Sequence, residues 1–385
     1  MKKLVMLSVE SVFSGRVHSG MAEMVDSLAN ALSKDYAVTI VCPDGNSIFT
    51  RTASTLETIE EGVRFCRFSA VNYYLVSPNM WLEKVASITE RLQPDILHNF
   101  AEPEILDMLS TRPAKAICTF DQSKFVEGKE QYLVHYDSVT TSSLQYAKDV
   151  LDVGDSLAQT LSSIDFQGIT AGITYAAFAP EKGLLIPAKY TADAQDGKQL
   201  CKQKLLKIYG INDNSYICLM MCRLIKEKGL EQVFDSIQTI RDTGGVLVIV
   251  GKGNHSYEKQ LRKYRRSDGV VYIDRWASPV QAAPLAAGAD FYLCPSNTEA
   301  CGLMPMTASR YGAVPIVTLN GGLADNFNNE NAIVIDDKGL PDAIKRAAEL
   351  YSDNDLMTAK RKICMEQDFS WTTRKVKYME LYEKE

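Results

Sequence analysis

Residues 291–317 read FYLCPSNTEACGLMPMTASRYGAVPIV, and this stretch decides the fold class. A β-rich apolar run over 291–296 ends at a turn, a helical segment follows, and a second apolar run covers 314–318. A strand, a helix and a strand in this order place the two strands parallel, joined by a right-handed crossover. The stretch therefore predicts a parallel sheet with helices packed against it.

The same alternation runs through both halves of the chain. Strands are predicted over 4–9, 38–42, 95–99, 115–120 and 138–143, and then over 216–221, 246–251, 270–274 and 332–335; helices are predicted over 20–32 and 80–92. Residues 176–196 are rich in Pro, Gly and Ala without periodicity, which is typical of a loop linking two lobes. We expect an α/β protein with two Rossmann-like, doubly wound lobes and an interlobe cleft outside the carboxyl ends of the strands.

The composition excludes several classes of protein. The chain has 385 residues, 46% hydrophobic and 23% charged, which is the usual mixture of soluble globular proteins. A formal net charge of −6 lacks the basic field that non-specific nucleic-acid binding needs. No apolar stretch reaches the ~18–20 residues of a membrane span, and residues 1–13 are expected to form a buried strand rather than a signal peptide. The nine cysteines form no CxxC pair, so we expect a reducing cytoplasm and no zinc site.

The most informative candidate site lies in residues 221–237, MCRLIKEKGLEQVFDSI. Arg223 follows a predicted strand, and Lys228 and Gly229 stand at the start of a predicted helix. Two cations beside the free N–H groups and the positive dipole end of a helix form a good diphosphate site. Taken alone, the segment also fits a solvated loop with ordinary basic residues.

Three further loops follow strands of the same predicted sheet. They contain Gly251 and Gly253 after the strand 246–251, Glu299, Cys301 and Gly302 after 291–296, and Gly321 and Gly322 after 314–318. A G-x-G turn indicates a close backbone approach, which is more often a tight connection than a nucleotide contact. The helix that opens after the second of these loops offers free N–H groups to sugar hydroxyls. Because parallel strands end at one edge, the four loops are expected to meet there.

These segments resemble a known family. In order and spacing, CRLIKEKGL, VGKG, SNTEACGLMPMTASRYGAVPIV and NGGLADNF resemble the donor-binding lobe of bacterial glycogen and starch synthases, retaining glycosyltransferases of the GT-B fold. The resemblance is strongest over 216–327 and looser before residue 140. Residues 369–382, FSWTTRKVKYMELY, look like the closing helix that returns to the N-terminal lobe. The resemblance thus implies an acceptor-side lobe of 1–175 completed by 366–385, and a donor-binding lobe of 176–365.

The resemblance also implies an activity. It predicts an ADP-glucose or UDP-glucose donor, an oligosaccharide or polysaccharide acceptor, net retention of configuration, and neither a metal nor another cofactor. Arg223 and Lys228 match the pair that stabilises the departing diphosphate, because preorganised positive charge at the leaving group is the main catalytic device. Glu299 matches the family glutamate near the donor sugar. The remaining positions matched to donor binding are Cys301, Gly302 and Leu303, together with Gly20, Gly251, Gly253, Gly321 and Gly322.

The chain departs from the family in its first lobe. The family's Lys-x-Gly-Gly loop is replaced by GRVHSG at 15–20, where Arg16, one residue out of register, is the candidate for the same phosphate. Asp121 stands where the family has a histidine beside the reacting carbons. Asp121 either caps the following segment or has a catalytic role. We expect donor chemistry to be retained and acceptor recognition to be altered around Asp121, Arg16 and Glu23.

Two other features favour ordinary structural roles. His98 follows a strand and is expected to face the interlobe cleft, but a lone histidine is more often a packing residue than a catalytic one. The basic run at 259–268 is more typical of a solvated helix face than of a nucleic-acid site. The sequence therefore predicts a glucosyltransferase of the glycogen and starch synthase kind. A transferase with a smaller non-glucan acceptor and a non-catalytic sugar-nucleotide or glycan-binding subunit remain alternatives.

Overall fold

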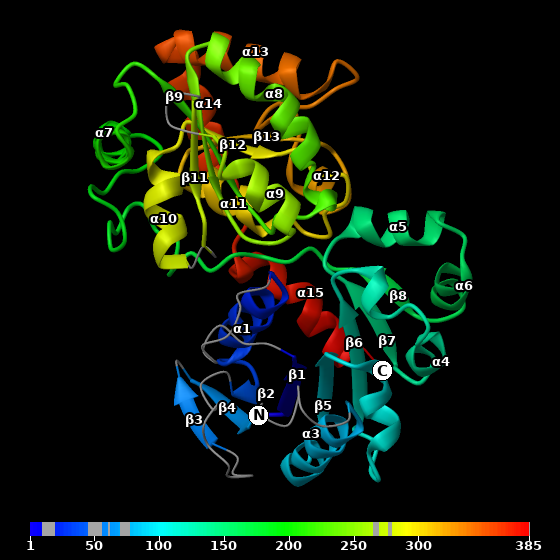
Figure 1. Ribbon diagram of the computed structural model, residues 1–385. Helices are drawn as coiled ribbons and strands as arrows, with labels where there is room; N and C mark the ends of the chain where they lie inside the picture. Colours follow the sequence, from blue (N-terminus) through cyan, green and yellow to red (C-terminus); the bar gives the residue numbers. More distant parts are fainter. Residues whose placement is uncertain are drawn as a thin grey trace. The chain divides into compact units, whose positions relative to one another are not determined.

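The computed structural model describes residues 1–9, 20–44, 56–60, 62–69, 78–264, 269–275 and 279–384 (Figure 1). The chain divides into two compact units, Met1–Gly172 with Ser370–Glu385 and Ile173–Phe369. These bounds differ by a few residues from the sequence-based ones, which fall after residues 175 and 365. The reason is local, because the N–H of Ile173 donates to the carbonyl of Phe369 at 2.8 Å and so joins the two ends of the second unit.

The first unit is built on an eight-stranded sheet in the order β3-β4-β2-β1-β5-β6-β7-β8. Its strands are β1 (Lys3–Ser8), β2 (Ala37–Asp44), β3 (Leu56–Glu60), β4 (Val63–Ser69), β5 (Ile96–Phe100), β6 (Lys115–Phe120), β7 (Ser138–Thr141) and β8 (Phe166–Gly168). Its helices are α1 (Gly20–Leu32), α3 (Pro78–Leu92), α4 (Glu130–Leu133), α5 (Leu144–Asp152), α6 (Ser156–Ser162) and α15 (Trp371–Glu383), with 3₁₀ turns η2 (Pro103–Met108) and η3 (Ser123–Phe125). The central strands β1 and β5 are buried almost throughout, as expected for a parallel sheet covered on both faces.

The edge of this sheet corrects the expectation of parallel strands alone. β3 runs antiparallel to β4, with Leu56 opposite Arg67 and Glu60 opposite Val63. Gly62 in the connection has φ of 85°, a conformation that glycine adopts without steric cost. The short hairpin needs no crossover helix. The other strand pairs of this sheet are parallel.

The C-terminal helix α15 packs on the first unit. Its Trp371 Nε1 donates to Ser27 Oγ on α1 at 2.7 Å. Lys375 forms an ion pair with Asp35 at 2.5 Å. Figure 1 shows this helix, drawn in red, in the unit that also contains the N-terminus. The last residues of the chain therefore complete a core that begins with its first strand.

His98 on β5 belongs to that core. Its Nδ1 lies 2.7 Å from the hydroxyl of Tyr382 on α15, and its Nε2 lies 2.6 Å from Thr119 Oγ1 on β6. Burial lowers the pKa of the imidazole to about 3, so the ring is neutral near pH 7. Both ring nitrogens are engaged within the core. The packing role favoured by the sequence is confirmed.

The second unit is built on a six-stranded parallel sheet in the order β11-β10-β9-β12-β13-β14. Its strands are β9 (Tyr216–Met221), β10 (Gly245–Val250), β11 (Val270–Ile273), β12 (Phe291–Cys294), β13 (Val314–Val317) and β14 (Ile333–Val334). Its helices are α7 (Asp196–Tyr209), α8 (Leu230–Asp242), α9 (His255–Leu261), α10 (Pro279–Gly288), α11 (Leu303–Arg310), α12 (Gly322–Asn326), α13 (Gly339–Ser352) and α14 (Asn354–Glu366), with the 3₁₀ turn η4 (Lys226–Lys228). The strand order reverses between β9 and β12. Such a switch point is where open α/β sheets bind ligands.

The segment 174–195, which contains most of the linking loop predicted at 176–196, packs on the second unit. It contains no helix or strand. Tyr190 within it is buried, and its hydroxyl donates to the carbonyl of Tyr311 at 2.9 Å. Glu181 forms an ion pair with Arg310 at 2.8 Å. The lack of hydrophobic periodicity correctly predicted a loop. Tyr190 and Glu181 hold this loop against the end of α11.

A buried carboxylate anchors the amino ends of the strands beside the switch point. Asp290, fully buried just before β12, accepts a hydrogen bond from the N–H of Ile217 on β9 at 2.9 Å. It also forms ion pairs with Lys202 on α7 and Arg361 on α14, each at 2.6 Å. One side chain therefore holds two strands and two helices together.

Candidate functional site

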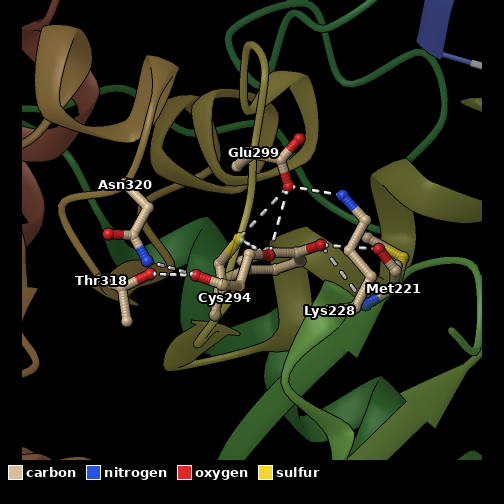
Figure 2. A network of polar contacts seen from close by, with 8 residues as sticks. Met221, Lys228, Cys294, Glu299, Thr318 and Asn320 are labelled. Atoms are coloured by element: carbon tan, nitrogen blue, oxygen red, sulfur yellow. Dashed lines mark hydrogen bonds and ion pairs between the residues drawn. The ribbon is translucent and has the colours of Figure 1, made fainter. Parts of the chain in front are cut away.

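Polar side chains gather at the carboxyl ends of β9 and β12, on the two sides of the switch point (Figure 2). β9 is followed by Arg223 and then by η4, which ends at Lys228. Gly229, with φ of 69°, is the N-cap residue that precedes α8. β12 is followed by the loop that contains Glu299 and ends at α11. The sequence thus placed Arg223, Lys228 and Glu299 on neighbouring loops, as the structure has them.

Lys228 and Glu299 form the central contact of the site. Lys228 Nζ lies 2.6 Å from Glu299 Oε2, and the two side chains are only 17% and 16% exposed. Ser296 Oγ donates to the same carboxylate oxygen at 3.3 Å, and the thiol of Cys294 lies 3.9 Å from it. Burial alone would lower the pKa of Lys228, but the negative charge of Glu299 outweighs it and the net shift is upward. Lys228 is therefore a fixed cation.

Arg223 supplies charge that is not neutralised. Its side chain is half-buried, and within the described part of the chain it has no ion-pair partner. Lys228, by contrast, is balanced by Glu299. The two loops therefore carry one unpaired guanidinium beside a neutral Lys–Glu pair. This arrangement favours a ligand that brings negative charge to the edge of the sheet.

Hydrogen bonds join the loop after β12 to the loops on both of its sides. The N–H of Asn297 donates to the carbonyl of Glu227 at 2.8 Å. Thr318 Oγ1 and Asn320 Nδ2, both after β13, donate to the carbonyl of Ser296 at 2.6 and 2.9 Å, as Figure 2 shows for the two donors. Sequence reasoning missed these three positioning residues. Their positions just after predicted strands could have indicated that these polar residues belong to the site.

The predicted glycines lie where one loop backbone approaches another. A Cβ on Gly229 would stand 1.9 Å from the carbonyl oxygen of Pro295. A Cβ on Gly251 would stand 2.1 Å from the carbonyl oxygen of Cys222, and one on Gly253 would stand 2.5 Å from that of Leu224. The tight connections of the site therefore account for these glycines. Their contact with a donor remains a prediction.

The remaining loop positions open two helices. Gly302 has φ of 86° and precedes α11 as an N-cap residue that makes no side-chain hydrogen bond. The N–H of Gly322 donates to the carbonyl of Glu299 at 2.8 Å. Gly321 precedes it with φ of 54°. Cys301 is buried between these two helix starts.

Other predicted positions belong to the first unit or lie outside the described residues. Arg16 lies outside them. Gly20 is the exposed first residue of α1, and Glu23 lies in the same turn, where burial raises the pKa of its carboxyl group. Asp121 is half-buried directly after β6. Gln122, rather than Asp121, occupies the N-cap position of η3.

No helix in the described part of the chain is both long and apolar enough to cross a membrane. No group of three or more His, Cys, Asp or Glu residues there is arranged to hold a metal ion.

Comparison with known proteins agrees with this geometry. Residues 202–368 match the family model described as "Glycosyl transferases group 1". The glycogen synthase of Marinomonas sp. (strain MWYL1) is 32% identical over 275 residues, 66% of this chain and 57% of that protein. That of Geotalea daltonii is 35% identical over 263 residues, 64% of this chain and 54% of that protein. The chain thus spans little more than half the length of these curated relatives.

Solved structures show the same fold. The catalytic domain of starch synthase IV from Arabidopsis thaliana, bound to ADP and acarbose, superposes with a TM-score of 0.86 at 21% identity, covering 99% of this chain and 98% of that one. Sucrose-phosphate synthase from Thermosynechococcus elongatus gives 0.74 at 15% identity, with 99% and 98% covered. The chain therefore has the GT-B fold of these structures, with two Rossmann-like lobes, and its second unit matches the glycosyl transferase model. More particularly, about two thirds of its sequence is similar to bacterial glycogen synthases, in agreement with the resemblance seen in its motifs.

Proposed function

We propose that this chain is a retaining glucosyltransferase that transfers glucose from ADP-glucose or UDP-glucose to a glucan-type acceptor. The observation that carries the proposal is the unpaired Arg223 beside the Lys228–Glu299 pair at the switch point. A nucleoside diphosphate is the anion that such an edge accommodates best. Two of the structural neighbours are described as bound to ADP and acarbose and to UDP and glucose, which supports the same class of ligand here.

The proposed chemistry is stabilisation of the leaving group. An ammonium has three donor hydrogens, and Lys228 uses one of them for Glu299, so two remain for phosphate oxygens. Arg223 offers a planar guanidinium suited to bidentate phosphate contacts. Charge that develops on the departing diphosphate then meets donors that are already in place. The start of α11, whose N-cap residue Gly302 makes no side-chain hydrogen bond, is suited to the glucose hydroxyls.

A direct assay tests this function. The protein is incubated separately with ADP-glucose and UDP-glucose, and nucleotide release is followed with and without glycogen. Release that depends on glycogen is the expected result. Release only with a small saccharide acceptor would support the altered acceptor, and donor binding without release would support a non-catalytic subunit. If the protein neither binds the donor nor releases nucleotide, the proposal is contradicted.

Transfer is expected to survive removal of divalent metal. In the proposed mechanism Arg223 and Lys228 stabilise the negative charge of the leaving group, so a divalent ion is not needed there. The measurement is the initial rate after dialysis against EDTA, compared with a sample dialysed against buffer. Loss of activity that magnesium or manganese restores would contradict this expectation.

Replacement of Asp121 is expected to alter acceptor use. An aspartate is normally an anionic acceptor, whereas a histidine in its place would donate a hydrogen bond. We expect slow transfer to long α-1,4-glucan by the unmodified chain, and an increase of about tenfold in Asp121→His, the worth of one hydrogen bond of ~1.4 kcal/mol. Rapid elongation of glycogen that is insensitive to Asp121→Ala would show that Asp121 does not lie at the reacting sugar.

The proposed compartment is the cytoplasm. All nine cysteines are free thiols, and all but Cys222 are buried. Burial raises the pKa of the Cys294 and Cys364 thiols to about 12, so both stay protonated and unreactive. A reducing environment suits such a set of thiols.

A further inference from the structure

A groove between α8 and α9 has no part in the proposed transfer. It encloses about 800 Å³, within the range of ~300–1,000 Å³ that small-molecule sites occupy. Its lining combines apolar or aromatic side chains with three cations: Phe234, Ile237 and Tyr264, and Arg241, Lys259 and Lys263. The described residues that line it include no carboxylate.

Some cations of the same unit have carboxylate partners, whereas the cations of the groove do not have them among the described residues. Arg262, Arg346 and Lys362 each have a carboxylate partner. Within the described residues, the three cations of the groove have none. Of the acidic residues on the same helices, Glu258 pairs with Arg262, Glu231 accepts a hydrogen bond from Tyr257, and Asp242 accepts one from the lining residue Gln238. The groove therefore gathers three cations that have no ion-pair partner among the described residues.

The helix dipole explains why Arg241 and Lys259 each stand at the end of a helix. It does not explain why their side chains line the same groove. Arg241 and Lys259 lie in the last turns of α8 and α9, where the helix dipole favours positive charge. The dipole does not require both side chains to line one concave surface together with Lys263, Phe234 and Tyr264. In a chain with a net charge of −6, this positive groove is a local exception.

We propose that the groove binds a small phosphorylated sugar. Its phosphate groups pair with Arg241, Lys259 and Lys263, because charge-assisted contacts to phosphate are among the strong polar interactions of proteins. Its ring lies against the aromatic side chains, whose faces suit the C–H surface of a sugar. The site is separate from the candidate donor loops, so it holds whether or not the chain transfers glucose.

Calorimetric titration of the full chain tests the proposal, with fructose 1,6-bisphosphate and ribose 5-phosphate as probes and fructose as the neutral comparison. We expect one bisphosphate per chain, tighter binding than of ribose 5-phosphate, weakening with added salt, and no binding of fructose. The variant Arg241→Gln/Lys259→Gln should weaken binding by about tenfold or more, since each loses a charge-assisted contact. The matched control is Lys204→Gln/Lys207→Gln, which removes the same charge from exposed lysines of α7.

Three outcomes would overturn the inference. The first is that neither sugar phosphate binds. The second is equal binding by the groove variant and the α7 control. The third is binding that Arg223→Ala abolishes and the groove variant leaves unchanged, because the probe would then occupy the loops after β9. Since each readout is binding rather than transfer, the result is independent of whether the proposed function is correct.

Discussion

Arg223→Ala is expected to lower kcat for glucosyl transfer by about 30-fold to 1,000-fold, which corresponds to ~2–4 kcal/mol of lost transition-state stabilisation. The reason is that Arg223 has no ion-pair partner among the described residues, and a guanidinium can form bidentate contacts to phosphate that a lysine on the same loop cannot. Lys228→Ala is expected to cause a loss of the same order. The measurement is steady-state kinetics with the donor that the unmodified chain uses.

Lys226→Ala is the matched control, because Lys226 is an exposed cation of η4 on the same loop. Its rate should stay close to that of the unmodified chain. Arg223→Lys should recover part of the loss, since a lysine keeps the charge but not the planar fork. If Arg223→Ala and Lys226→Ala both turn over as fast as the unmodified chain, Arg223 has no role in the proposed mechanism.

Arg223→Ala and Lys228→Ala are expected to change the free energy of unfolding by different amounts. Arg223→Ala breaks no ion pair among the described residues. Lys228→Ala leaves the Glu299 carboxylate, 16% exposed, without its partner. A double-mutant cycle with Glu299→Gln separates this structural cost from lost catalysis. If both single variants melt alike, the Lys228–Glu299 pair contributes little to the folded loop.

Much of the fold could be predicted from apolar runs with clear ends. The runs at 115–120 and 216–221 coincide with β6 and β9, and the amphipathic segment 20–32 coincides with α1. In a buried parallel strand nearly every side chain is apolar, so the boundary is visible as the first polar residue. The edge strands β3 and β4 carry arginines and glutamates among their apolar residues, and this mixture gave no comparable signal.

The site was predictable in position but not in its internal contacts. Polar residues and glycines after successive strands locate the edge of the sheet, which is why Arg223, Lys228 and Glu299 were found. Which carboxylate neutralises which cation depends on side-chain directions across two loops. No spacing in the sequence shows that Lys228 is paired and Arg223 is not. The same holds for Thr318 and Asn320, whose bonds to Ser296 exist only once β12 and β13 are neighbours.

Asp290→Asn is expected to destabilise the second unit by about 3–5 kcal/mol, because removing one charge from a buried network leaves its partners uncompensated. Lys202 and Arg361 would keep their charges with side chains only 4% and 15% exposed. Urea denaturation followed by far-UV circular dichroism measures the change, with the two units treated as separate transitions.

Asp193→Asn is the control for Asp290→Asn. The ion pair of Asp193 also ends on α14, at Lys362, but its side chains are 77% and 46% exposed. Its loss should cost at most about 1 kcal/mol. Equal effects of the two substitutions would mean that the Asp290 network is not an anchor. Because Asp290 precedes β12 and the candidate site follows it, turnover of Asp290→Asn measured below its unfolding transition should stay near that of the unmodified chain. A variant that is folded but inactive would instead show that the amino-end anchor also sets the geometry of the Lys228–Glu299 pair.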